Sequence, residues 1–289
     1  MLVKFVEDPK QKLIHIQSQC RRSIKRPTRA AAYTGMVVFL YSLMSSSIAS
    51  AAIITVGTNK ICDHSTIQAA VTAAFSGDTI RVTNEYFLAD DAVFNVIGKS
   101  LTIRGGRVSC EAFSSYSGKT TLDGTGMGEA DSVIELVDSA GAMSVSLRDF
   151  IIRGGKKDAD GGGGIEISGK PSASIAERMD VTLDAVNIFS NTSGNGGGIH
   201  VTNAIVMISN ESLIRSNHAD VDGGGIYCEN SDITLLQDSV IGESGNLSGN
   251  GAVMSGGGVL LDNCSLTLDA NDGVTGAYIT GNEATGDGG

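Results

Sequence analysis

Three side chains that could take part in polar chemistry occupy the same position in successive segments of the chain. Glu166, His200 and Tyr227 each follow an isoleucine that ends a glycine cluster, and Leu260 follows the corresponding valine. A carboxylate, an imidazole and a phenol can move protons or bind a polar ligand. If the preceding residues face a core, strand alternation turns these side chains outward in a row. We expect a solvated face with His200 on the surface; the alternative is that the row lines a groove.

The row belongs to a repeat that begins with a glycine cluster. The residues that end the clusters, Ile165, Ile199, Ile226 and Val259, are 34, 27 and 33 residues apart. Each repeat adds an alternating triplet and a third short segment, which makes three β-type segments joined by Gly, Asn, Ser and Asp turns. Strands this short bury their apolar side only by stacking on neighbouring repeats. We predict an all-β parallel β-helix, triangular in section, with roughly eight coils about 4.8 Å apart.

The residue types at the turns of the repeat can be explained by backbone conformation. A corner made by a glycine cluster needs a positive φ or a close backbone approach, which glycine permits at least cost. Asn191, Asn217 and Asn282 lie at another corner. Asparagine tolerates the left-handed region and can hydrogen-bond its equivalent one coil away. We therefore expect a ladder of asparagines along one edge of the solenoid.

A short helix is expected at the start of the domain. Ser65 and Gln68 have the spacing of a capping box. Four apolar residues follow at helical spacing, and the segment 79–82 is predicted to be the first strand. Such a helix would cover the apolar open end of the solenoid and its unpaired strand edges. The apolar positions are Ile67, Ala70, Val71 and Ala74.

Residues 1–51 have the pattern of a secretory signal with an extended basic start. They hold eight Lys and Arg, an apolar run at 36–44, and small residues leading to Ala49-Ser50-Ala51. A basic region, an apolar region and an A-x-A site define such a signal. The apolar run is shorter than the roughly 20 residues that span a bilayer; an uncleaved anchor is the alternative. No second apolar span follows, so we expect no membrane span in the exported chain.

Export changes what the cysteines are expected to do. Cys20 leaves with the signal, which leaves an even number in an oxidising compartment. No Cys-x-x-Cys or Cys/His spacing indicates zinc. We expect Cys62 to bond Cys110 and tie the cap to the early coils, and Cys228 to bond Cys264. The alternative is four small buried thiols.

Charge and composition narrow the classes of partner. Past residue 52 the chain has 13 Lys and Arg against 30 Asp and Glu, a formal charge of −17. That charge repels phosphate backbones, so no nucleic acid partner is expected. The 38 glycines have no G-X-Y period, which excludes collagen. Asp160 and Asp222 precede glycine pairs without matching the calcium-binding nonapeptide, so no cofactor is expected, and calcium is the alternative.

Two features together resemble a known group of proteins. Segments 66–71 and 77–82 resemble the N-terminal cap of right-handed parallel β-helix proteins of the pectin-lyase-like superfamily. The glycine clusters and Ile-x-x-Asn segments are similar to repeats of polymorphic outer-membrane proteins and autotransporter passengers, with isoleucine where that family often has phenylalanine. The resemblance covers 53–289 and implies a right-handed parallel β-helix solenoid with a short N-terminal capping helix.

The resemblance also suggests how the chain is divided. We expect a signal at 1–51, a cap and first coils at 52–100, and repeats at 101–289 that stop where a new coil should begin. The β-barrel that anchors such passengers in a membrane is not in this chain. Membrane attachment is therefore expected only through a C-terminal region outside it.

Function is less sharply indicated, because the superfamily contains both adhesins and polysaccharide enzymes. The motifs that the resemblance implies for its hydrolases are incomplete: Asn191-Thr-Ser193 lacks the aspartate of NTD, and Asp90-Asp91 is the single DD pair. Neither GHG nor RIK occurs. We assign no catalytic, cofactor or metal residue.

We expect a secreted or cell-surface, outer-membrane-associated protein that presents loops, as an adhesin-like or structural passenger, to an extracellular protein or glycan. The alternative is a polysaccharide lyase or glycoside hydrolase that uses an outward carboxylate on an extracellular glycan.

Overall fold

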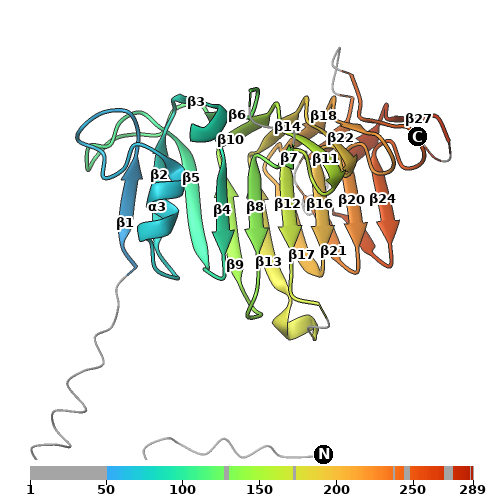
Figure 1. The fold of residues 1–289 in the computed structure, drawn as a ribbon, viewed down its shortest axis with the longest axis horizontal. Coiled ribbons are helices and arrows are strands. Elements are labelled where there is room, and N and C mark those ends of the chain that lie inside the picture. Colours follow the sequence, from blue (N-terminus) through green and yellow to red (C-terminus); the bar gives the residue numbers. More distant parts are fainter. Residues whose placement is uncertain are drawn as a thin grey trace, which may run out of the picture. The chain divides into compact units, whose positions relative to one another are not determined.

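The computed structural model shows an all-β parallel β-helix solenoid with a short α-helix near the start of its described residues (Figure 1). The predicted signal lies outside the described residues, except for Ala51. Residues 51–289 form one compact unit, in which successive coils follow one another from the blue to the red end of the ribbon. The structure describes residues 51–126, 130–171, 174–236, 238–243, 248–269, 276–286 and 288.

The longest sheet, called sheet A, takes one strand from each of eight coils, as the repeat count predicts. Like residues stack along its inner face: Ile80 lies opposite Ile103, which lies opposite Leu147, and all three are 0% exposed. Aliphatic side chains in register give each short strand the burial it lacks alone. Its strands are β1 (Ile53–Val56), β2 (Thr79–Thr83), β5 (Leu101–Arg107), β9 (Ser144–Arg148), β13 (Met179–Asp184), β17 (Ala204–Ser209), β21 (Asp232–Leu236) and β25 (Ser265–Asp269).

Sheets B and C complete the predicted three sides. Ile188 and Ile214 of the Ile-x-x-Asn segments point into the core from sheet B, and Ile165, Ile199 and Ile226 after the glycine clusters do so from sheet C. In the last described coil the equivalent Ile279 is 38% exposed and Val259 is half-buried. Sheet B contains β3 (Tyr86–Leu88), β6 (Thr120–Asp123), β10 (Phe150–Arg153), β14 (Asn187–Phe189), β18 (Leu213–Arg215), β22 (Val240–Gly242) and β26 (Tyr278–Thr280). Sheet C contains β4 (Phe94–Ile97), β8 (Ile134–Val137), β12 (Ile165–Ser168), β16 (Ile199–Thr202), β20 (Ile226–Glu229) and β24 (Val259–Asp262).

The prediction of three strands per coil was wrong, because a fourth ladder, sheet D, joins the Asn corner to the glycine cluster. Its strands are short and rich in small residues, so they have no apolar alternation to reveal them. Among the described strands, β7 and β11 form the one antiparallel pair. Sheet D contains β7 (Ala130–Asp131), β11 (Lys156–Asp160), β15 (Thr192–Asn195), β19 (His218–Ala219), β23 (Gly251–Ala252) and β27 (Glu283–Ala284).

The glycine corners have both predicted properties. Gly196, Gly223 and Gly256 open their clusters with φ of 66°, 68° and 62°. Later glycines in each cluster allow coils to approach closely: a Cβ on Gly198 would lie 2.6 Å from the carbonyl oxygen of Gly225. A side chain at either kind of position would strain the backbone or push two coils apart.

The predicted asparagine ladder is present and has a further member, Asn250. Asn191 Nδ2 donates to Asn217 Oδ1 over 3.0 Å, Asn217 Nδ2 to Asn250 Oδ1 over 3.0 Å, and Asn250 Nδ2 to Asn282 Oδ1 over 2.9 Å. The first three side chains are buried. The expectation that asparagine itself adopts the left-handed region was wrong. The preceding residue makes the turn, with φ of 55° at Ser190, which leaves the amide to bond the neighbouring coils.

The predicted cap is helix α3 (Ile67–Ala73), which covers the first coils (Figure 1). Its N-cap is Thr66, whose side chain accepts a hydrogen bond from the Ala69 amide, and not Ser65 as the capping-box spacing suggested. Gln68 bonds the Asn95 amide in β4 instead of its own N-cap. The predicted apolar face is buried. The segment predicted as the first strand is the second, β2, because β1 precedes the helix and pairs with β2. Two 3₁₀ turns complete the described helices, η1 (Ala89–Asp91) and η2 (Ile175–Glu177).

Candidate functional site

The row proposed from the sequence forms on the outer side of sheet C. Glu166 lies opposite His200, His200 opposite Tyr227, and Tyr227 opposite Leu260, on β12, β16, β20 and β24. Parallel pairing repeats the register from coil to coil, so equal offsets from the glycine clusters become neighbours in space. Glu135 on β8 extends the row by one coil.

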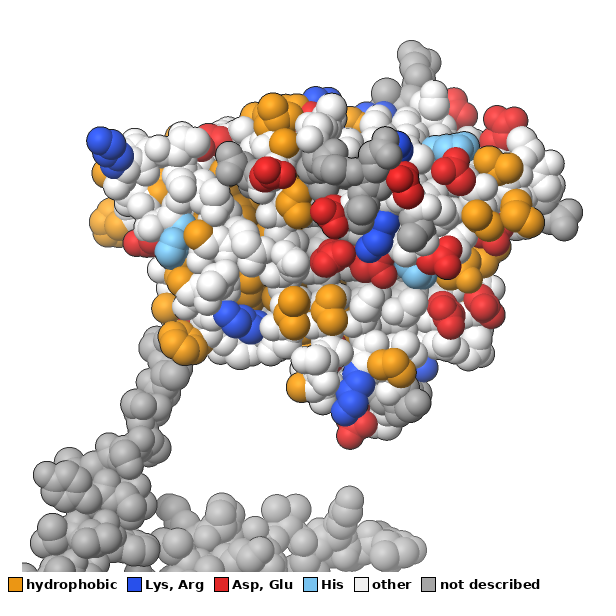
Figure 2. Space-filling model, viewed as in Figure 1, with side chains coloured by type: hydrophobic (Ala, Val, Ile, Leu, Met, Phe, Trp, Pro, Cys, Tyr) orange, Lys and Arg blue, Asp and Glu red, His pale blue; other side chains and the backbone are white. Residues whose placement is uncertain are grey.

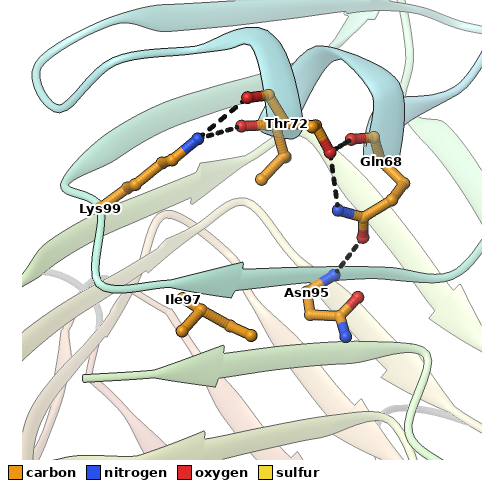
Figure 3. Close-up of a pocket in the computed structure, with 6 residues that line it drawn as sticks. Gln68, Thr72, Asn95, Ile97 and Lys99 are labelled. Carbon is orange, nitrogen blue, oxygen red and sulfur yellow. Dashed lines mark hydrogen bonds between the residues drawn. The ribbon is translucent and has the colours of Figure 1, made fainter. Parts of the chain in front are cut away.

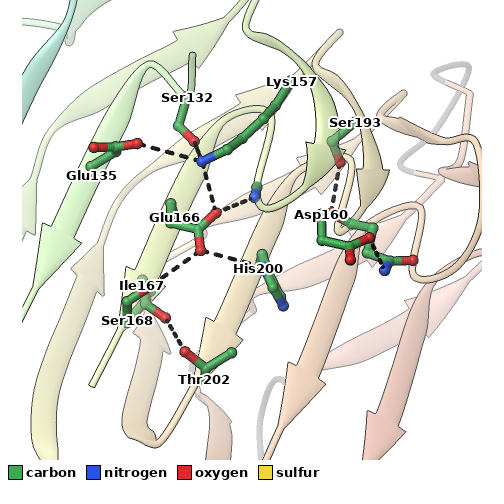
Figure 4. A network of polar contacts seen from close by, with 12 residues as sticks. Ser132, Glu135, Lys157, Asp160, Glu166, Ile167, Ser168, Ser193, His200 and Thr202 are labelled. Atoms are coloured by element: carbon green, nitrogen blue, oxygen red, sulfur yellow. Dashed lines mark hydrogen bonds and ion pairs between the residues drawn. The ribbon is translucent and has the colours of Figure 1, made fainter. Parts of the chain in front are cut away.

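A lysine from the unpredicted sheet D connects the two carboxylates of the row (Figure 4). Lys157 Nζ on β11 lies 3.4 Å from Glu135 Oε1 and 3.3 Å from Glu166 Oε2. The same ammonium lies 3.4 Å from Ser132 Oγ, and the Gly162 amide donates to Glu166 Oε2 over 2.8 Å. The site is therefore a compact charged network and not an isolated carboxylate.

His200 is outward-facing but not solvated, so the expectation of a surface histidine was wrong. It is 8% exposed, and Nδ1 lies 3.4 Å from Glu166 Oε1. Its ring meets the Tyr227 ring edge-on at 5.1 Å between centroids. Gly162 packs so tightly on its backbone that a Cβ there would lie 2.7 Å from the His200 nitrogen. Glu166 and Tyr227 flank the ring, and neither ring nitrogen has a well-formed hydrogen bond.

The network holds Glu166 in its ionised form. Burial alone would raise the pKa of Glu166, but contacts with His200, Lys157 and the Gly162 amide outweigh burial and lower it. Burial raises the pKa of Tyr227, helped by nearby acidic residues such as Asp262, so the phenol keeps its proton. Glu166 could accept a proton or stabilise a cation, but it is a poor proton donor at neutral pH.

The covering of the network limits what it can do to a substrate. The side chains of Lys157, Glu166 and His200 are 16%, 13% and 10% exposed, so little of the network is accessible to a sugar. Sequence reasoning found the row but missed Glu135 and Lys157. Glu135 follows an isoleucine as Glu166 does, yet no glycine cluster precedes it. Lys157 comes from a ladder that has no sequence signature.

A shallow groove of about 400 Å³ lies beside the cap, between α3 and β4 (Figure 3). Its polar groups already bond one another. Lys99 Nζ donates to the carbonyls of Val71, Thr72 and Ala74 at 2.9, 3.1 and 2.8 Å. A cation on the last carbonyls of a helix is a stabilising C-terminal interaction. The groove is therefore best explained as part of the cap.

The acidic residues beside the glycine clusters also have structural partners. Asn195 Nδ2 donates to Asp160 Oδ1 over 2.9 Å, and the Asp222 amide donates to Asn195 Oδ1 over 3.1 Å. Asp222 Oδ1 accepts from the Ser255 amide. Within the described ranges, no three His, Cys, Asp or Glu side chains converge as a metal site would require. Asp90, of the Asp-Asp pair, is exposed on η1.

Both expected cysteine pairs are bonded in the structure. Cys62 bonds Cys110, with Cα atoms 5.2 Å apart, and joins the segment before α3 to the loop after β5. Cys228 bonds Cys264, with Cα atoms 6.2 Å apart. Cys228 occupies an inward position of β20 and is buried, and Cys264 lies at the corner before β25. The first bond encloses the cap, and the second joins adjacent coils.

A second polar cluster lies on the outer side of sheet B and involves Asp123. Arg153 Nε donates to Asp123 Oδ2 over 2.8 Å, and the Tyr86 hydroxyl bonds the same oxygen. Burial would raise the pKa of Asp123, but hydrogen bonds from Thr125, Tyr86 and Arg153 lower it to about 2. This carboxylate joins three successive coils near the cap.

Replacing Asp123 with asparagine is therefore expected to destabilise the fold in a pH-dependent way. A folded-state pKa of about 2 against an ordinary 3.8 corresponds to about 2 kcal/mol of stability at neutral pH. Because the folded-state pKa is lowered, that stability is present above about pH 4 and is lost as the pH falls toward 2. Urea unfolding at pH 7 and pH 2 measures it. The exposed Asp90 changed to asparagine is the control, and an equal loss at both pH values would contradict the assignment.

No family model, curated protein or solved structure matches this chain. Of the helices in the described part of the chain, none has the length and apolarity needed to cross a membrane. What the protein does is therefore inferred from its fold, a parallel β-helix solenoid, and from the contacts above.

Proposed function

We propose that the protein is a secreted or cell-surface β-helix that presents its outer faces and loops to an extracellular protein or glycan. The contrast between its inner and outer rows carries the proposal. Inner rows repeat like residues, as in Val145, Val181 and Val206 of sheet A, whereas the adjacent, partly exposed outer row changes from Ser146 to Thr182 to Met207. Packing holds the inside constant and leaves the outside free to recognise a partner.

The two disulfides support an extracellular location. Disulfides form and persist in oxidising compartments and are rare in the cytosol. Both bonds of this chain lie where they hold the solenoid together, at the cap and between two late coils. The basic and apolar pattern of residues 1–51 is consistent with export. In analogy with passenger proteins, we propose attachment to an outer membrane through a further C-terminal region.

Cell fractionation with a reporter tests this proposal. Residues 1–51 fused to a periplasmic enzyme that is active only after export should give activity outside the cytosol. A matched fusion in which the apolar run 36–44 is interrupted by two arginines should give none. Enzyme retained in the cytosol by the unaltered fusion would contradict export.

The second candidate function is a polysaccharide lyase or glycoside hydrolase, and the ionised Glu166 beside His200 and Lys157 favours it. An anionic carboxylate could act as a base or nucleophile, with Glu135 one coil away. A panel of extracellular polysaccharides, assayed with and without calcium, tests this candidate. Product release that is abolished by Glu166→Gln and retained by the control Glu229→Gln would replace the first proposal. If the unaltered protein releases no product from any polysaccharide, the network has a structural role.

A further inference from the structure

Three arginines form a row on the outer side of sheet A, near the cap. Arg81 on β2 lies opposite Arg104 on β5, and Arg104 lies opposite Arg148 on β9. Adjacent parallel strands are about 4.8 Å apart, so three guanidinium groups are held along one line. Like charges placed opposite one another on a sheet are destabilising unless anions lie between them.

The protein supplies only part of that neutralisation. Asp149 Oδ2 accepts from Arg104 Nε over 2.9 Å and lies 3.5 Å from Arg148 Nε. Asp184 Oδ2 lies 3.3 Å from a terminal nitrogen of Arg148. The Arg81 side chain has no hydrogen bond or ion pair with any other described residue, and its Nε is buried without an acceptor. The terminal nitrogens of Arg81 are not among the buried unpaired atoms, so an external anion could supply their acceptor.

The row is both held in place and accessible. The Arg104 guanidinium lies over the Tyr116 ring, 3.5 Å from its centroid, which fixes its plane. The side chains of Arg104 and Arg148 are 31% and 44% exposed, and Arg81 is half-buried. A ligand could therefore reach the row from solvent without moving the backbone.

The charge of the surrounding surface restricts the length of an anionic ligand that could bind the row. Residues 53–126 carry six Lys and Arg and seven Asp and Glu, whereas residues 127–289 carry seven and 23. Figure 2 shows acidic side chains gathered over the later coils on the face of sheet C. A polyanion that ran far along the solenoid would be repelled, so the site suits a short, densely charged ligand.

We propose that Arg81, Arg104 and Arg148 bind the sulfate groups of a sulfated glycan, with Arg81 as the principal anchor. Guanidinium groups are weakly hydrated, and one guanidinium can donate two parallel hydrogen bonds to two oxygen atoms of the same sulfate group. Asp149 and Asp184 already form ion pairs with Arg104 and Arg148. A ligand must compete with these carboxylates, so it needs a higher charge density than one carboxylate per sugar. The inference rests on the proposed function only in taking an extracellular glycan as the partner.

Calorimetric titration of the purified protein with a heparin tetrasaccharide at low salt tests the proposal. The unaltered protein should bind, and Arg81→Gln should weaken binding about tenfold. Arg215→Gln is the matched control. Arg215 Nε is also buried without an acceptor, but its guanidinium lies over the Phe189 ring on sheet B and belongs to no arginine row. The control should change binding less than twofold.

An oligogalacturonate of the same length separates sulfate from carboxylate recognition and should bind at least tenfold more weakly than heparin. Thermal unfolding of both variants confirms that they are folded. Absence of heparin binding, equal weakening by the two substitutions, or equal affinity for oligogalacturonate would overturn the proposal. Because binding is measured on purified protein, these results are independent of the export test.

Discussion

Replacement of Asn217 by leucine should lower the free energy of unfolding by at least about 4 kcal/mol, from several buried polar groups left unpaired at about 1–3 kcal/mol each. Asn217 donates to Asn250 Oδ1 and the Ile188 carbonyl, and it accepts from the amide and side chain of Asn191. Asn217 is 2% exposed, so water cannot replace these partners. The effect is large because the side chain of Asn217 forms hydrogen bonds that link three successive coils.

Urea unfolding followed by circular dichroism measures the loss. Asn95→Leu is the control, since Asn95 is exposed on β4 and should change stability by less than about 0.5 kcal/mol. Asn282→Leu, at the less buried end of the ladder, should give an intermediate loss. Equal stability of the Asn217 and Asn95 variants would show that the ladder does not hold the coils together.

Removal of the Cys62–Cys110 bond by paired serine substitutions should cost about 3–4 kcal/mol in the chain-entropy estimate for its loop of 48 residues. The bond fixes the segment before α3 to the loop after β5. Without it, α3 separates more readily from the first coil and exposes buried residues such as Ile67 and Val71. We therefore expect limited proteolysis to begin at the cap in this variant.

Dithiothreitol provides the control for the disulfide prediction. The reductant should destabilise the unaltered protein and have a smaller effect on the double-serine variant, which retains Cys228–Cys264. The corresponding substitutions at Cys228 and Cys264 should leave the cap resistant to proteolysis. A reductant that changed neither the stability nor the cleavage pattern of the unaltered protein would contradict the stabilising role of both bonds.

The features that could be predicted from the sequence are those that recur with the coil. The inward isoleucines, the glycine corners and the asparagine ladder repeat because each must stack on its own equivalent in the next coil. Even the outer row of Glu166, His200 and Tyr227 follows from this register. The parallel β-helix and its cap could therefore be derived without a structure.

The features that could not be predicted depend on contacts between different ladders. Sheet D has strands as short as the two residues His218–Ala219, too short for alternation to be recognised. Lys157 reaches Glu135 and Glu166 from that sheet, so its role was hidden too. Alternation gives the direction of His200 but not its contacts with Glu166 and Tyr227 or its burial.

The central claim, that the β-helix is exported and acts outside the cytosol as a disulfide-bonded protein, is tested most directly by one intact-mass measurement. The protein is recovered from outside the cytosol of its source cells, denatured, and alkylated before and after reduction. We predict a chain that begins at Ala52, with no alkylated cysteine before reduction and alkylation of Cys62, Cys110, Cys228 and Cys264 after it. A cytosolic chain that retains residues 1–51 and is alkylated without reduction would contradict the claim.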